Sequence, residues 1–145
     1  NILIIGVAAG VSEELFFRGA LQRLLSTGGM STHAAVWTAA VVFSAMHLQF
    51  FGFVPRMLLG AYFGYLLVWS RSIWLPAAAH ALNNTVYVIM QWYYLRNGEP
   101  DVTIDNVGLG STWPWAIVSL AATILLIVIT YRSRRRPAAQ SHATL

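Results

Sequence analysis

Five apolar stretches, separated by short turns that contain glycine or polar residues, make up most of this 145-residue chain. They lie near residues 2–26, 31–49, 54–70, 73–96 and 113–132. Hydrophobic residues form 57% of the sequence and charged residues only 10%, against about 25% charged in a typical soluble domain. Because a membrane span needs about 20 apolar residues, the pattern predicts an all-α, multi-pass transmembrane helical bundle of about five hydrophobic helices.

The ends of these stretches show helix start and stop signals. Gly28 and Gly29 end the first stretch, Ser31 is a good N-cap for the second, and Pro76 falls in the first turn of the fourth, where proline is tolerated. We expect residues 1–132 to form one membrane core and residues 133–145 a basic, disordered tail. Because the chain begins at Asn1 inside an apolar run, we also expect an N-terminal truncation with upstream helices missing.

The placement of arginine predicts the orientation. All nine basic residues are arginine, and four of them, Arg132 and residues 134–136, directly follow the last apolar stretch. Such a cluster is typical of a cytoplasmic anchor beside membrane lipid rather than of a nucleic-acid site. The C-terminus is therefore predicted to be cytoplasmic and residues 97–112 to be outside. The absence of cysteine excludes disulfides, thiolate metal ligands and cysteine nucleophiles. The absence of lysine excludes lysine-based catalysis.

Two adjacent acids, Glu13 and Glu14, interrupt the first apolar stretch. The other three acids of the chain are Glu99, Asp101 and Asp105, which lie together in one polar loop. Placing a carboxylate at membrane depth costs about 2.5 kcal/mol or more. A chain that does so twice in succession is expected to use the charge.

Helical geometry gives the two acids different surroundings. Glu14 and Arg18 are four residues apart and can form an ion pair on one helix face. Glu13 lies about 100° round the axis, on a face with Gly6 and Gly10, whose small-xxx-small spacing lets another helix approach closely. We therefore predict a structural role for Glu14 and expect Glu13 to face a neighbouring helix.

Two further stretches present polar side chains at the same four-residue spacing. The second stretch has Phe43 and His47, and the fourth has His80 and Asn84. Together with Glu13, these imidazoles and the amide could activate water, with the carboxylate as general base and a neighbour stabilising an oxyanion. Alternatively, Glu13, His47 and His80 could bind a divalent metal, zinc first, and leave one position for water. Both possibilities lead to hydrolysis and both stay open.

The three motifs occur in a fixed order over about residues 8–90. They read Glu13-Glu14-x-x-x-Arg18, Phe43-x-x-x-His47 and His80-x-x-x-Asn84. This ordered set resembles the intramembrane CPBP family, which includes the CAAX prenyl endopeptidases and the bacteriocin-processing or self-immunity proteins, also called the Abi family. Members usually have additional N-terminal helices, which this sequence does not include.

The resemblance implies an intramembrane endopeptidase in a prokaryotic cell membrane, acting on peptide or prenylated-protein substrates of the CAAX or leader-peptide type. It implies a catalytic role for Glu13, with His47, His80 and Asn84 completing the site. The supporting residues would be Glu14, Arg18 and Phe43. Members are described as metalloproteases, although a metal-free, glutamate-activated water is also argued for the family.

Other chemistries fit the sequence less well. A His-Glu-x-x-His zinc motif is absent, and Asp101 and Asp105 lie in the polar loop and not in an apolar stretch. Ser12 could serve a serine–histidine pair, but two acids follow it directly. A proton-coupled transporter and a non-catalytic immunity or scaffold protein remain as alternatives. The sequence does not identify the substrate or the oligomeric state.

Overall fold

The computed structural model describes residues 2–50, 52–97, 117, 124–125 and 127–132, and every element that it contains there is a helix. The all-α prediction is therefore confirmed for these residues. The chain divides into two compact units, Asn1–Asn106 and Val107–Leu145. The helices named below all belong to the first unit. The predicted boundary between residues 132 and 133 stays a prediction, because residues 133–145 lie outside the described ranges.

The first helix combines π-helical and α-helical turns without a break. Its segments are η1 (Ile2–Ala8), α1 (Ala9–Glu14), η2 (Leu15–Gln22) and α2 (Arg23–Thr27). It ends where predicted, because the N–H of Gly28 donates to the carbonyl of Leu24 and Gly29 adopts a φ of 99°. That backbone conformation is accessible mainly to glycine.

Three more helices follow, α3 (Thr32–Met46), α4 (Phe53–Ser70) and α5 (Trp74–Arg96). The Ser31 hydroxyl accepts a hydrogen bond from the N–H of Ala34 at 3.3 Å, so the predicted N-cap of α3 is confirmed. The prediction that this helix continues to about Gln49 is wrong. It ends at Met46, because Leu48 has a φ of 53° and turns the chain out of the helix.

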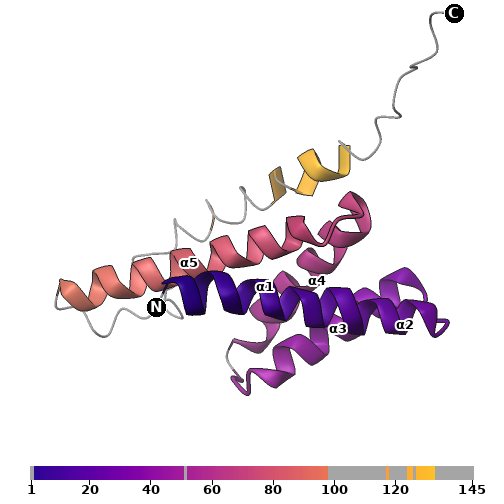
Figure 1. Ribbon diagram of the computed structural model, residues 1–145, viewed down its shortest axis with the longest axis horizontal. Helices are drawn as coiled ribbons and strands as arrows, with labels where there is room; N and C mark the ends of the chain where they lie inside the picture. The colour runs from indigo at the N-terminus through magenta and orange to yellow at the C-terminus, as the bar shows by residue number, and fades with distance from the viewer. Residues whose placement is uncertain (1, 51, 98–116, 118–123, 126, 133–145) are drawn as a thin grey trace, which may run out of the picture. The chain divides into compact units, whose positions relative to one another are not determined.

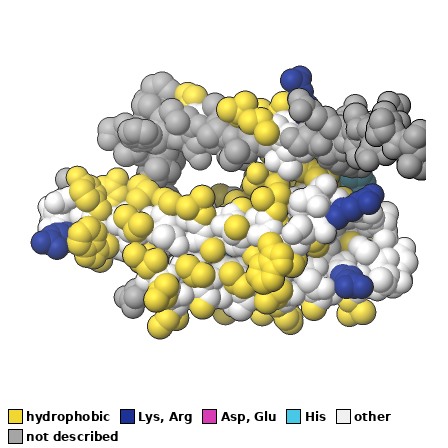
Figure 2. Space-filling view, turned by 45° about the horizontal axis from the view of Figure 1, so that its top comes forward, with side chains coloured by type: hydrophobic (Ala, Val, Ile, Leu, Met, Phe, Trp, Pro, Cys, Tyr) yellow, Lys and Arg dark blue, Asp and Glu magenta, His cyan; other side chains and the backbone are white. Residues whose placement is uncertain are grey.

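Within the described residues, one helix is long and apolar enough to cross a membrane, namely α4, with a mean hydropathy of 1.2. Helix α3 is apolar but shorter. The predicted fifth stretch falls largely outside the described ranges, so the multi-pass topology stays a prediction. Figure 2 shows one face of the molecule on which apolar side chains cover much of the described surface and no acidic side chain is visible.

The first half of the first helix packs antiparallel against α5, and the two ribbons run side by side in Figure 1. Gly6 lies against Thr85, and Gly10 lies against the backbone of Ala81. A Cβ added to Gly10 would meet the Ala81 nitrogen at 2.8 Å. The predicted role of these glycines in a close helix approach is confirmed, and it brings Glu13 and Glu14 next to α5.

The second half of the first helix lies parallel to α4. The Arg18 Nη2 donates to the carbonyl of Gly60 at 2.7 Å, and the Gln22 Nε2 donates to the carbonyl of Gly64 at 3.3 Å. The two donors are four residues apart, and so are the two acceptors, as expected for two helices that run parallel.

Helix α3 also approaches α4 at Gly60 and Gly64 and completes the core. The two helices run antiparallel, and Val36 and Ala40 of α3 form a buried apolar cluster with Ala61 of α4. Helices α3, α4 and α5 thus surround the buried polar groups of the first helix.

Candidate active site

Glu14 is the most deeply buried acid of the described residues, with 0% of its surface exposed. Its Oε1 accepts a hydrogen bond from Arg18 Nη1 at 2.7 Å, so the predicted ion pair is confirmed. The same oxygen also lies 2.7 Å from the Nδ1 of His80 on α5. This second contact was not predicted, and it places Glu14 directly beneath one of the candidate catalytic histidines.

Arg18, which is 1% exposed, neutralises Glu14 within an aromatic cage. Its guanidinium carbon lies 4.9 Å from the ring centroid of Phe43, 5.6 Å from that of Phe63 and 5.9 Å from that of Phe17. A desolvated cation is stabilised over aromatic faces, and the two charge-assisted hydrogen bonds to Glu14 and Gly60 add to this. The cage therefore lowers the cost of burying both charges.

The contact with Glu14 fixes the tautomer of His80. An ionised carboxylate only accepts hydrogen bonds, so the Nδ1 of His80 must be the donor. In the neutral ring the lone pair is then on Nε2, and this atom lies 3.6 Å from the Oε2 of Glu13. The buried pair of Glu14 and Arg18 thus orients His80 toward the second acid.

Glu13 differs from Glu14 in both exposure and partners. The Oε2 atoms of both acids are buried and have no hydrogen-bond partner within the described part of the chain, but the Glu13 side chain is 31% exposed and its Oε2 lies beside the His80 Nε2. Two acceptors, this oxygen and the His80 Nε2, therefore lie close together. A water molecule beside them could donate one hydrogen to each, which is the arrangement that a general base requires. The prediction that Glu13 faces a neighbouring helix is confirmed.

His47 is the exposed C-cap residue of α3, and its ring contacts Phe43 of the aromatic cage. Its Nδ1 donates to the carbonyl of Phe43 at 2.8 Å, which leaves the lone pair of the neutral ring on Nε2. The rings of His47 and His80 both make edge contacts with Phe43, at centroid distances of 4.9 and 5.7 Å. Among the described residues, no hydrogen bond or ion pair joins His47 to Glu13 or His80.

Asn84 lies one turn beyond His80 on α5. Its Nδ2 donates to the carbonyl of Ile5 in η1 at 3.5 Å, a long hydrogen bond that leaves the amide oxygen available. The structure thus brings Glu13, Glu14, Arg18 and His80 into one connected group and places Asn84 next to it along α5.

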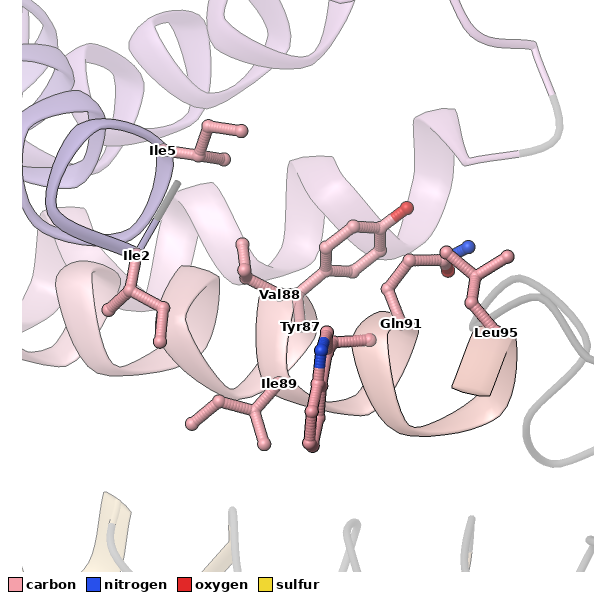
Figure 3. Close-up of a pocket in the computed structure, with 8 residues that line it drawn as sticks. Ile2, Ile5, Tyr87, Val88, Ile89, Gln91 and Leu95 are labelled. Carbon is pink, nitrogen blue, oxygen red and sulfur yellow. The ribbon is translucent and has the colours of Figure 1, made fainter. Parts of the chain in front are cut away.

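Ile5 also lines an apolar groove between η1 and α5. The groove has a volume of about 820 Å³ and lies between Ile2 and Ile5 of η1 and six residues of α5 between Tyr87 and Leu95. Figure 3 shows Ile2 and Ile5 on the ribbon of η1 and Val88 and Leu95 on that of α5, with Leu95 near the end of this helix.

The predicted metal site needs three protein ligands, namely Glu13, His47 and His80. In the part of the chain that the structure describes, no group of three or more His, Asp or Glu side chains is close enough to hold a metal ion. Glu13 and His80 supply two neighbouring donors, and His47 does not join them. The residues therefore do not fit a three-ligand metal centre, and we assign no chemical step to a metal.

Two features of the site were missed by the sequence analysis. The ring of Phe63 stacks on the imidazole of His80, at a centroid distance of 4.9 Å and an interplanar angle of 25°. The carbonyl of Gly60 accepts from Arg18. Neither has a sequence signal, because a phenylalanine in an apolar helix usually indicates packing. Ser12, the alternative nucleophile, donates its hydroxyl to the carbonyl of Ala9 in its own helix.

The comparisons with known proteins show the family of this chain. The family model described as type II CAAX prenyl endopeptidase Rce1-like matches residues 1–86, which include all three motifs. The uncharacterized protein YpbD of Bacillus subtilis (strain 168) is 22% identical over 111 residues, which cover 73% of this chain and 54% of that relative. The chain thus spans about half the length of this relative. No solved structure matches the chain. The chain belongs to the Rce1-like family of type II CAAX prenyl endopeptidases.

Proposed function

We propose that this protein is an intramembrane endopeptidase in which Glu13 activates a water molecule. One observation supports this most directly. The buried Oε2 of Glu13 has no hydrogen-bond partner among the described residues and lies 3.6 Å from the Nε2 of His80, whose other nitrogen is held by Glu14. A buried acceptor without a donor is costly, so a water that donates to both groups would satisfy them.

The chemistry follows from the positions of these two acceptors. The water gives a proton to the pair of Glu13 and His80 as its oxygen attacks the carbonyl carbon of the peptide bond. Asn84, through its second Nδ2 hydrogen, is the proposed partner of the resulting oxyanion, and His47 would join it as an imidazolium, in which Nε2 also donates. The same pair then passes the proton to the leaving amine, which breaks the C–N bond. The pair of Glu14 and Arg18 keeps His80 in the required tautomer throughout.

The proposed substrate is a membrane-associated peptide or prenylated protein. The groove along α5 is apolar, and Ile5, whose carbonyl Asn84 contacts, is one of its lining residues, which supports its use by an apolar portion of the substrate. The proposed setting is the prokaryotic cell membrane, as a multi-pass protein with a cytoplasmic C-terminus. The other proposed partners are membrane lipids, and nucleic acid is not among them.

The test is cleavage in proteoliposomes of a prenylated CAAX peptide and of an unprenylated apolar leader peptide. We expect Glu13→Gln to lower kcat by about 10² to 10⁴, the usual contribution of a general base. Glu99→Gln changes an acid outside the apolar stretches and serves as the control, with activity equal to that of the wild type. Equal activity of Glu13→Gln and the wild type would refute the assignment.

A second measurement addresses the metal. Because the described residues supply only two neighbouring donors, we propose the metal-free version of this mechanism. Elemental analysis of the purified protein should then show no stoichiometric zinc, and activity should survive a chelator. One bound zinc ion per chain, together with loss of activity on chelation and recovery on zinc addition, would contradict it.

A further inference from the structure

Phe63 of α4 contacts the proposed catalytic histidine through the face of its ring. It is 2% exposed and stacks on the imidazole of His80 at a centroid distance of 4.9 Å, with 25° between the two planes. Phe43 approaches the same imidazole edge-on, at 5.7 Å and 84°. The imidazole is thus packed against one ring face and one ring edge.

The hydrogen bond to Glu14 fixes one atom of the imidazole but not its plane. A ring held only at Nδ1 can still tilt about that contact, and the tilt moves the other ring nitrogen, Nε2. The separation between Nε2 and the Glu13 Oε2 is 3.6 Å, so a small tilt changes whether one water can reach both atoms. A flat ring stacked on the imidazole restricts this motion, because aromatic pairs favour defined plane-to-plane arrangements.

We propose that Phe63 is a positioning residue that keeps the imidazole of His80 in the plane that directs Nε2 toward Glu13. This inference rests on the proposed function for its effect on cleavage, whereas its effect on the ring of His80 is independent of activity. Phe63 does not line the substrate groove, so its proposed effect on cleavage passes through the imidazole of His80.

The position of Phe63 is itself set by the first helix. Arg18 donates to the carbonyl of Gly60, three residues before Phe63, and its guanidinium lies 5.6 Å from the Phe63 ring centroid. Arg18 also bonds Glu14, which holds the Nδ1 of His80. The two restraints on His80, one at its nitrogen and one on its face, therefore both depend on Arg18.

Three variants of the full chain in detergent micelles or proteoliposomes test the proposal. Phe63→Leu keeps an apolar side chain but loses the flat ring, and Phe63→Tyr keeps the ring. Leu66→Ala is the matched control, because Leu66 is a buried apolar residue of the same helix, 3% exposed, that makes no ring contact with His80. The first readout is the hydrogen-bonded Nδ1 proton of His80 by NMR of histidine-labelled protein, assigned with His80→Gln.

We expect the Nδ1 proton signal of His80 to shift or broaden in Phe63→Leu and to be retained in Phe63→Tyr and Leu66→Ala. In the cleavage assay we expect kcat of Phe63→Leu to fall about 10-fold or more with KM unchanged, because small misplacements of a reacting group cost up to about 10²-fold. An unchanged signal in Phe63→Leu, or an equal loss of kcat in Leu66→Ala, would overturn the proposal. If the wild type cleaves neither peptide, the proposed function fails while the NMR comparison still decides the role of Phe63.

Discussion

Replacing Arg18 by methionine tests whether the charge on this residue holds the buried site together. Methionine keeps an unbranched apolar stem beside Phe43 and Phe63 but removes the guanidinium and both of its hydrogen bonds. Glu14, which is 0% exposed, would then keep only His80 as a partner. The change thus leaves a buried carboxylate without its counter-charge.

The expected loss of stability follows from these contacts. Breaking a buried ion pair by removing one partner costs about 3–5 kcal/mol, because the remaining charge is left uncompensated. The lost bond to the Gly60 carbonyl, 2.7 Å long, belongs to the same guanidinium, and hydrogen bonds to charged groups contribute about 1.5–3 kcal/mol each. Since the two effects share one group and do not add in full, we expect a total of about 4 kcal/mol.

The assay is equilibrium unfolding in detergent micelles, followed by circular dichroism, for the wild type and three variants. Arg23→Met makes the same substitution at an exposed arginine of α2, and we expect it to change the free energy of unfolding by less than about 0.5 kcal/mol. The double variant Glu14→Gln with Arg18→Met removes both charges. We expect it to be more stable than Arg18→Met alone, because no unpaired charge remains.

Two results would refute this reasoning. The first is a loss of less than about 1 kcal/mol in Arg18→Met, which is the range of an exposed pair. The second is a double variant less stable than the single variant, which would mean that shape and not charge is lost at this site.

The other predictions concern the helices that hold the site. Gly10→Ala should destabilise the protein by about 1–3 kcal/mol, because the new Cβ would lie 2.8 Å from the Ala81 nitrogen, whereas Gly19→Ala, whose nearest contact would be at 3.9 Å, should be neutral or stabilising in the same unfolding assay. Equal losses in both variants would contradict the close approach. Ser31→Ala should cost about 1 kcal/mol through loss of the N-cap of α3, and a thermal melt identical to that of the wild type would refute that role.

Much of the fold could be predicted, because its signals are local. Gly28 and Gly29 end the first helix, Ser31 caps α3, and the spacing of Gly6 and Gly10 matches the contact with α5. The end of α3 was missed, since the left-handed backbone of Leu48 has no residue-specific signal. Membrane crossing by several helices stays a prediction, because one described helix is long and apolar enough to span and most of the fifth stretch lies outside the described residues.

The sequence named the candidate site residues but few of the contacts between them. The four-residue spacing of Glu14 and Arg18 was enough to predict their ion pair, and the three motifs identified His47, His80 and Asn84 as candidates. The bond between Glu14 and His80 depends on the tertiary approach of α5, which helical periodicity does not specify. Backbone acceptors such as the Gly60 carbonyl are also invisible in a sequence, because every residue has one.

The two hydrogen bonds from the first helix to α4 end on main-chain oxygens, those of Gly60 and Gly64. A main-chain acceptor is kept by almost any substitution, provided that the side chain leaves room for the donor. The anchoring of α4 therefore constrains side-chain size at two positions and leaves the chemistry of its exposed side chains open to change. Substitutions on that exposed surface can accumulate while the paired acids and His80 keep their geometry.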